Sequence, residues 1–139
     1  GKNDYSKFKK LENINYHPFE FTQNVASIMR NVDLVVSRSG ASTLTEIAAS
    51  SKAAIIIPLA IAAGDHQEMN ALVFQKRNAA VVVSENNLSS ITLKNIIEDI
   101  IEDQDMLKLL GQHAHEFYQP KASQEIIDII FKVTQNENL

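Results

Sequence analysis

The sequence of 139 residues contains no cysteine and no tryptophan, and only four glycines and three prolines. Without cysteine, the chain has no disulfide bond, thiolate metal site or cysteine nucleophile. Lysine and arginine, 13 together, are outnumbered by 17 acidic residues and form no cluster, so the formal charge of −4 gives no indication of a nucleic-acid partner. The sequence also lacks an apolar run of roughly 20 residues, the length that a membrane-spanning helix needs.

Apolar residues make up 45% of the sequence, which is enough for a hydrophobic core. A chain of this length is typical of one domain, so we expect residues 1–139 to form a single domain. The lack of cysteine is compatible with a reducing cytoplasm.

Short apolar runs alternate with helix-like patterns along the chain. The runs predict strands at 33–37, 54–57 and 80–83, with a weaker candidate at 14–16. Apolar residues at helical spacing predict helices at 21–31, 43–51, 65–77, 91–101, 104–118 and 122–135. Thr22 is the candidate N-cap of the first of these helices, and the first dozen residues are polar and show no periodicity. The alternation predicts an α/β fold, a Rossmann-like parallel sheet with flanking helices.

The most informative stretch runs from Ser39 to Glu46, directly after the predicted strand 33–37. A ligand can approach the backbone of its small-residue turn closely, and the helix behind it offers unpaired N–H groups and a positive dipole to an anion. Glu46, one turn inside that helix, is placed to accept hydrogen bonds from hydroxyl groups, which indicates a nucleotide or nucleotide-sugar site. The alternative is an ordinary strand-to-helix turn, in which Gly40 supplies backbone freedom and Thr43 caps the helix.

A second polar group, residues 65–70, opens another predicted helix at the carboxyl end of a strand, where ligands of parallel sheets bind. Asp65 is the candidate helix cap and His66 the residue that faces a ligand. Gln67 and Asn70 are three residues apart and share a helix face. The alternative, which this stretch alone favours, is a capped surface helix with solvated side chains.

Other polar and aromatic residues are explained without a ligand. His113 and His115 lie two apart on a predicted helix and diverge, so they lack metal-ligand spacing. The acidic run at 98–105 is typical of a solvated helical face. Phe117 and Phe131 sit at core spacing.

Taken jointly, the motifs follow a specific order. They are Asp33-Leu34-Val35-Val36, Ser37-Arg38-Ser39-Gly40-Ala41-Ser42-Thr43, Glu46-Ile47-Ala48, Pro58, Asp65-His66-Gln67 and Asn70-Ala71. Over residues 16–131 the chain resembles the C-terminal, donor-binding half of the MurG family, two-domain GT-B glycosyltransferases of bacterial peptidoglycan synthesis and so of cell wall biogenesis, cell shape and cell division. The resemblance is most specific between residues 33 and 71.

The resemblance implies an inverting hexosyltransferase that moves N-acetylglucosamine from UDP-N-acetylglucosamine to lipid I, giving lipid II. The family's donor contacts match Ala41, Ser42, Thr43, Leu44, Thr45 and Glu46. Backbone N–H groups there would meet the diphosphate, and Glu46 would bind the ribose hydroxyls. Gln67, with His66 beside it, matches the contact to the transferred sugar, and the uracil contact falls at Phe21 or Thr22. No metal or other cofactor is implied, because N–H groups and polar side chains would stabilise the diphosphate.

The sequence departs from the family pattern in one turn and in extent. Ser51 and Ala53 stand where the family generally has Gly and Pro, so this turn should be less rigid. The Gly-rich turn that opens the family's C-terminal domain is missing, as is the N-terminal domain with the acceptor site, the presumed catalytic base and the membrane-facing patch. We therefore expect an incomplete UDP-sugar-binding domain that begins inside a larger one and holds no catalytic residue.

The implied partners are UDP-N-acetylglucosamine and, through the missing N-terminal domain, a lipid-linked acceptor. The implied localisation is the cytoplasm, or the cytoplasmic face of the inner membrane as a peripheral part of the full enzyme. Two alternatives stay open. One is a non-catalytic subunit that binds the UDP sugar and docks on a separate membrane partner, and the other is an inactive truncated fragment.

Overall fold

The computed structural model describes residues 2–60 and 65–136 and is built around a three-stranded parallel sheet in the order β1-β2-β3. The strands are β1 (Leu34–Ser37), β2 (Ala53–Ile56) and β3 (Val81–Val82). Leu34 of β1 lies opposite Ala53 of β2, and Ile55 of β2 lies opposite Val81 of β3. The predicted parallel α/β sheet is confirmed.

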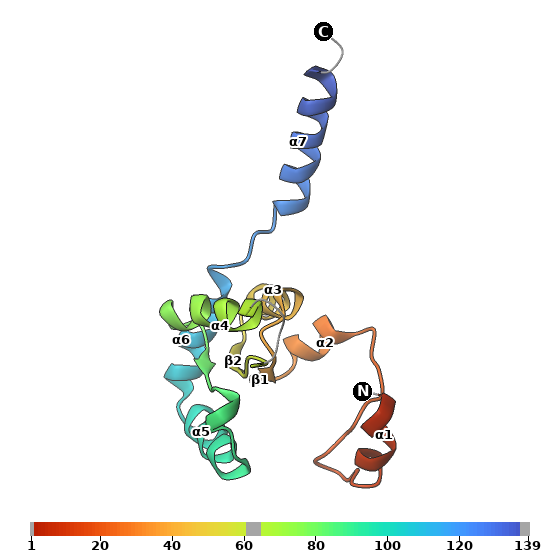
Figure 1. Cartoon of the computed structure of the whole chain (residues 1–139). Coiled ribbons are helices and arrows are strands. Elements are labelled where there is room, and N and C mark those ends of the chain that lie inside the picture. Colours follow the sequence, from red (N-terminus) through yellow and green to blue (C-terminus); the bar gives the residue numbers. More distant parts are fainter. Residues whose placement is uncertain (1, 61–64, 137–139) are drawn as a thin grey trace.

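Helices flank this sheet (Figure 1). The helices are α1 (Lys2–Lys9), α2 (Val25–Arg30), α3 (Ala41–Ser50), α4 (His66–Lys76), α5 (Ser90–Glu102), α6 (Gln104–His115) and α7 (Ala122–Asn136). Of these, α1 and α7 stand apart from the sheet (Figure 1). A short 3-10 turn, η2 (Glu85–Asn87), follows β3. The helices from α3 onward lie where the sequence predicts them, with small shifts of their ends. Part of the loop after β2, residues 61–64, falls outside the described residues.

The central strand β2 is buried on both faces. Ala53, Ala54, Ile55, Ile56 and the following Ile57 are each at most 7% exposed. Because successive side chains of a strand point to opposite faces, Ala54 and Ile56 pack in one cluster with residues of α2, α3 and α4. Ala53, Ile55 and Ile57 pack in a second cluster with residues of α5 and α6. The sheet is therefore covered on both sides, and only its edges and ends reach the surface.

The turn from α3 to β2 keeps a helix C-cap without glycine or proline. Ser51, the C-cap residue, has a left-handed φ of 54°, and Lys52 N–H donates to the Ile47 carbonyl oxygen over 3.4 Å, as in a Schellman motif. A left-handed backbone strains serine but not glycine, which is the physical reason why glycine suits this position. Gly111 of α6 packs against the same turn so closely that a Cβ there would collide with the Ser51 carbonyl oxygen.

The N-terminal part contains one helix that the sequence did not predict and contradicts one predicted strand. Residues 2–9 form α1 without apolar periodicity, since Asp4 in the first turn and Lys7 and Lys9 in the last turn suit the helix dipole. Residues 14–16 form no strand, because Asn13 and Tyr16 close a tight turn through an isolated antiparallel bridge.

Thr22 does not cap the helix that follows it. α2 begins at Val25, and its N-cap is Asn24. The Thr22 hydroxyl oxygen accepts a hydrogen bond from Asn24 N–H over 3.1 Å, so it stabilises a local turn before the helix begins. The predicted helix over 21–31 is therefore shorter than expected.

α7 extends away from the body on a linker that follows α6 (Figure 1). The predicted helix is confirmed, but the core position predicted for Phe131 is wrong, since this side chain is 61% exposed. Phe117, by contrast, is partly buried and stacks on Phe74 of α4 with ring centroids 4.5 Å apart. Within residues 2–60 and 65–136, no helix has the length and apolar character needed to cross a membrane.

Candidate functional site

The N-terminus of α3 begins four residues after the end of β1 and has no side-chain cap. Gly40 is the N-cap in an extended conformation, so Thr43 does not cap the helix. Among the described residues, no acceptor meets the backbone N–H groups of residues 41–43. Ala41 and Ser42 are exposed. Unpaired N–H groups at a helix N-terminus bind anions well, which fits the interpretation of the Ser39–Glu46 stretch as an anion site. Leu44 is 5% exposed and packs in the core, so its side chain fixes the helix.

Ser39 joins this turn to the start of α4. Its side chain is fully buried, and its hydroxyl donates to the Gln67 carbonyl oxygen over 2.7 Å. In return, the Asn70 side-chain amide donates to the Ser39 carbonyl oxygen over 3.0 Å. Gln67 and Asn70 lie three residues apart on α4, as predicted, but only Asn70 meets Ser39 through its side chain, because Gln67 meets it through its backbone carbonyl oxygen. The two predicted stretches, 39–46 and 65–70, are thus held together through this one residue.

The N-terminus of α4 lies beside that of α3 without a capping side chain. Asp65 occupies the N-cap with a left-handed φ of 52°, but its carboxylate makes no capping hydrogen bond, so the predicted capping role is wrong. A left-handed φ aims the side chain away from the helix N–H groups that an extended N-cap residue would reach. His66, the first helical residue, is exposed.

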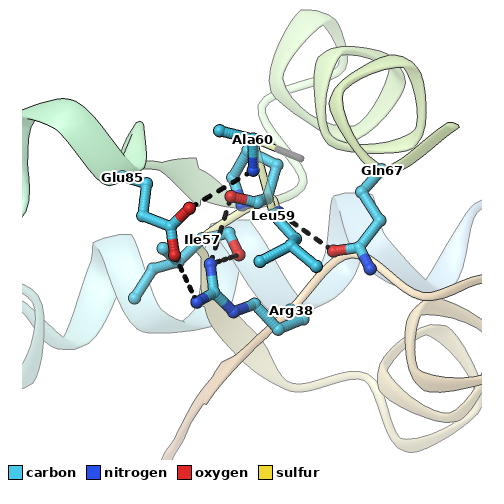
Figure 2. Close-up of polar contacts among 7 residues, drawn as sticks. Arg38, Ile57, Leu59, Ala60, Gln67 and Glu85 are labelled. Carbon is cyan, nitrogen blue, oxygen red and sulfur yellow. Dashed lines mark hydrogen bonds and ion pairs between the residues drawn. The ribbon is translucent and has the colours of Figure 1, made fainter. Parts of the chain in front are cut away.

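The backbone after β2 is held by a set of polar contacts that the sequence did not indicate (Figure 2). Arg38 donates through Nη1 to the carbonyl oxygens of Ile57 and Pro58, each over 3.2 Å, and through Nη2 to Glu85 Oε1 over 2.6 Å. The other Glu85 oxygen accepts from Ala60 N–H over 3.3 Å. We call Arg38, Glu85 and the segment 57–60 between them the loop clamp.

The loop clamp ties together the carboxyl ends of all three strands. Arg38 directly follows β1, the segment 57–60 follows β2, and Glu85 lies in η2 just beyond β3. The hydrogen bond from Arg38 holds the pKa of the Glu85 carboxyl below its ordinary value, and the Ala60 N–H lowers it further. Glu85 is therefore ionised at neutral pH, as an ion pair with Arg38 requires.

Gln67 is connected to the clamped segment through its side chain. Leu59 N–H donates to Gln67 Oε1 over 3.1 Å (Figure 2). The carboxamide is partly buried, and the same residue's backbone is tied to Ser39. Gln67 thus stands where the α3 turn, the start of α4 and the loop clamp meet.

The other predicted site residues line separate hollows. Ala41 and Thr45 border a cavity of about 230 Å³ that Asn70 also lines. Glu46 lies on a smaller cavity of about 100 Å³ beside Arg30 of α2. Thr22 lines an apolar groove of about 320 Å³ along the edge strand β1. The structure therefore joins residues 39–45 to Gln67 but leaves Glu46 and Thr22 on neighbouring surfaces.

The groups for which no ligand was expected have structural roles. The ring of His113 meets the Asn78 carbonyl oxygen at 3.1 Å, and that of His115 meets the Ala48 carbonyl oxygen at 3.0 Å, so the two histidines diverge as predicted. Glu98 in the acidic run pairs with Lys94 on exposed helix surface. In the part of the chain that the structure describes, no three histidine or carboxylate groups gather to hold a metal ion.

An α/β domain with uncapped helix N-termini at the carboxyl edge of a parallel sheet is typical of nucleotide-binding domains. The chain belongs to the glycosyltransferase family 28 C-terminal domain family, whose model matches residues 1–126.

Named relatives agree with this family. A UDP-N-acetylglucosamine–N-acetylmuramyl-(pentapeptide) pyrophosphoryl-undecaprenol N-acetylglucosamine transferase of Finegoldia magna is 31% identical over 142 residues, which cover 99% of this chain and 38% of that protein. The protein of the same name from Geobacter sulfurreducens is 38% identical over 117 residues, covering 84% of this chain and 32% of that protein. The crystal structure of Acinetobacter baumannii MurG matches with a TM-score of 0.82 at 26% identity, over 95% of this chain and 39% of that one. The chain spans less than two-fifths of the length of each of these proteins.

Proposed function

We propose that this chain is the donor-binding part of an inverting glycosyltransferase that moves N-acetylglucosamine from UDP-N-acetylglucosamine to lipid I, forming lipid II. The observation that carries the proposal is the pair of uncapped helix N-termini, of α3 and α4, joined by Ser39 at the carboxyl edge of the sheet. Membership in glycosyltransferase family 28 and the names of the relatives support it.

The proposed donor site assigns a part to each predicted residue. The unpaired N–H groups of residues 41–43 bind the diphosphate, where the N-terminal dipole of α3 favours negative charge. Glu46 accepts hydrogen bonds from the ribose hydroxyls, and Gln67 with His66 contacts the transferred sugar. Thr45 borders the same cavity as residue 41, and Thr22 is the proposed uracil contact.

The proposed chemistry is a displacement at the anomeric carbon. An acceptor hydroxyl gives its proton to the catalytic base as its oxygen attacks that carbon, the bond to the UDP oxygen breaks, and UDP leaves with the bonding pair. Preorganised N–H groups stabilise the charge that develops on the leaving diphosphate, and they need no reorganisation during the reaction. In this proposal the chain holds the leaving group, and the acceptor and the catalytic base belong to sequence outside these 139 residues.

We further propose that residues 1–139 are one incomplete UDP-sugar-binding domain that works with an acceptor-binding domain at the cytoplasmic face of the membrane. The small coverage of each relative is the observation that supports this arrangement. Mixing the chain with the N-terminal part of a relative and assaying lipid II formation tests whether the chain supplies the donor half. Co-purification with a separate partner chain would favour the arrangement in two subunits.

Calorimetry tests donor binding directly. We expect the chain to bind UDP-N-acetylglucosamine and UDP, and absence of heat with both ligands would refute the proposal. Glu46→Gln keeps the size of the side chain but removes a charged acceptor, so it should weaken binding of both ligands roughly tenfold. Glu98→Gln, on the exposed surface of α5, is the matched control and should leave both affinities unchanged.

A further inference from the structure

The loop clamp fixes which atom of Gln67 is free for a ligand. Leu59 N–H can only donate, so the carboxamide atom that faces it over 3.1 Å is the oxygen Oε1. The amide nitrogen Nε2 then points away from Leu59, as Figure 2 shows, and it carries two donor hydrogens. Gln67 therefore offers donors to whatever lies in front of it.

The orientation of Leu59 N–H depends on Arg38 and Glu85. Ile57 and Pro58 are held through their carbonyl oxygens by Arg38, and Ala60 is held through its N–H by Glu85. Leu59 lies between these anchored residues, so its peptide plane has little freedom to rotate. The 2.6 Å bond between Arg38 and Glu85 joins the two anchors, and bonds of this charge-assisted kind are short and directional.

We propose that Arg38 and Glu85 are positioning residues for sugar recognition: they hold Leu59 so that Gln67 presents its Nε2 donors to an oxygen of the sugar. This inference rests on the proposed function, because it assumes that Gln67 faces the sugar of a UDP-sugar donor. It adds the direction of the hydrogen bond between Gln67 and the sugar. The sugar atom that meets Gln67 is a hydrogen-bond acceptor, a hydroxyl or acyl oxygen, and the clamp acts on the sugar and not on UDP.

Two substitutions weaken the clamp with little change in size. Glu85→Gln cannot accept from Arg38 and Ala60 through both of its terminal atoms, since one of them becomes a donor. Arg38→Lys keeps the charge but loses the planar fork that reaches two carbonyl oxygens and Glu85 together. Lys94→Gln is the control, because it breaks an exposed ion pair with Glu98 that lies on α5.

The first measurement compares affinities for UDP and UDP-N-acetylglucosamine by calorimetry. We expect both clamp variants to weaken UDP-N-acetylglucosamine binding about five- to tenfold, the loss of roughly one hydrogen bond, and to change UDP binding less than about twofold. The Lys94→Gln control should keep both affinities. An unchanged ratio of the two affinities in Glu85→Gln would overturn the proposal while leaving the proposed function intact.

The second measurement tests whether the clamp acts through Gln67. In a Gln67→Ala background, Glu85→Gln should have no further effect on the ratio of the two affinities, because the side chain it positions is gone. A further fall in the affinity for UDP-N-acetylglucosamine relative to that for UDP would assign Glu85 another role and overturn the proposal. A merely structural role would lower both affinities in either background.

Amide hydrogen exchange on the ligand-free chain gives a readout that does not need the ligand. Leu59 and Ala60 should exchange at least about tenfold faster in Glu85→Gln than in the wild type, and equally fast in Lys94→Gln. Unchanged exchange in Glu85→Gln would overturn the clamp. If the wild type bound neither ligand, the proposed function would be refuted, and the role of the loop clamp in sugar recognition with it. Faster exchange in Glu85→Gln would then still show that the clamp contacts exist.

Discussion

The strand β2 and the helix α7 are both rich in isoleucine, yet the two have opposite environments. Ile55 and Ile56 of β2 are fully buried, whereas Ile126, Ile129 and Ile130 of α7 are 55% to 60% exposed. β2 has helices on both of its faces, and α7 stands apart from the body (Figure 1).

This difference shows that the spacing of apolar residues predicts whether a segment forms a helix or a strand, but does not predict whether that segment is buried. The spacing of apolar residues in α7 predicts a helix, and a helix forms there. Burial additionally requires a covering surface, which β2 finds in α3, α4, α5 and α6. Equal truncations in the two elements should therefore differ greatly in their effect on the stability of this chain.

The largest effect is expected for Ile56→Ala in β2. It leaves a cavity in the cluster under α3 and α4, and it should lower the free energy of unfolding by about 2 to 5 kcal/mol. Urea unfolding followed by circular dichroism measures this change. A loss below about 1 kcal/mol would contradict the rigid, two-sided packing of the strand.

A smaller loss is expected for Gly111→Ala in α6. The new Cβ would collide with the Ser51 carbonyl oxygen, a backbone atom that cannot rotate away, so we expect a loss of about 1 to 3 kcal/mol in the same urea experiment. Gln112→Ala, an exposed neighbour on the same helix, is the control and should change stability by less than about 0.5 kcal/mol. Equal stability of the two variants would show that the backbone turn after α3 shifts to make room for the added Cβ.

Ser51→Gly should stabilise the region around β2. The left-handed φ of 54° strains serine, and glycine relieves this strain, so we expect a gain of about 0.5 to 1 kcal/mol, seen as a higher melting temperature. Asn78→Gly is the matched control: its φ is 52°, but asparagine tolerates this conformation well, so its gain should be smaller. A larger gain at Asn78 would speak against strain at Ser51.

The smallest effect is expected for Ile130→Ala in α7. The side chain is 55% exposed, and alanine favours the helix, so the free energy of unfolding of this chain should change by less than about 0.5 kcal/mol. Urea unfolding under the conditions used for Ile56→Ala gives the direct comparison. A loss comparable to that of Ile56→Ala would mean that α7 is covered in solution.

The sequence predicts the centre of the fold well because its signals are local. β1, β2, α3 and α4 are each marked by an apolar run or a helical spacing next to a turn. α1 was missed because Asp4, Lys7 and Lys9 stabilise it through charge and not through apolar periodicity. The core position of Phe131 was wrong because spacing on a helix does not reveal which surface, if any, covers it.

The site could be predicted only as far as its parts lie in short motifs. The turn at 39–46 and the polar group at 65–70 each carry a local pattern, and the contact between Ser39 and Gln67 joins them. Glu85 carries no such pattern, since it pairs with Arg38 across 47 residues and depends on the order of the strands. A charged residue just beyond each of the two strands that flank β2, Arg38 after β1 and Glu85 after β3, is the signal that points to such a pair.

The two hydrogen bonds at the buried Ser39 make the starts of α3 and α4 a single mechanical unit. A displacement of one helix start is transmitted to the other, because the buried Ser39 is held to α4 through both its hydroxyl and its carbonyl oxygen. A ligand bound at one helix start would therefore also shift the other helix start. A redesign of this edge for a different ligand has to change the starts of α3 and α4 together, because a change at one of them moves the other.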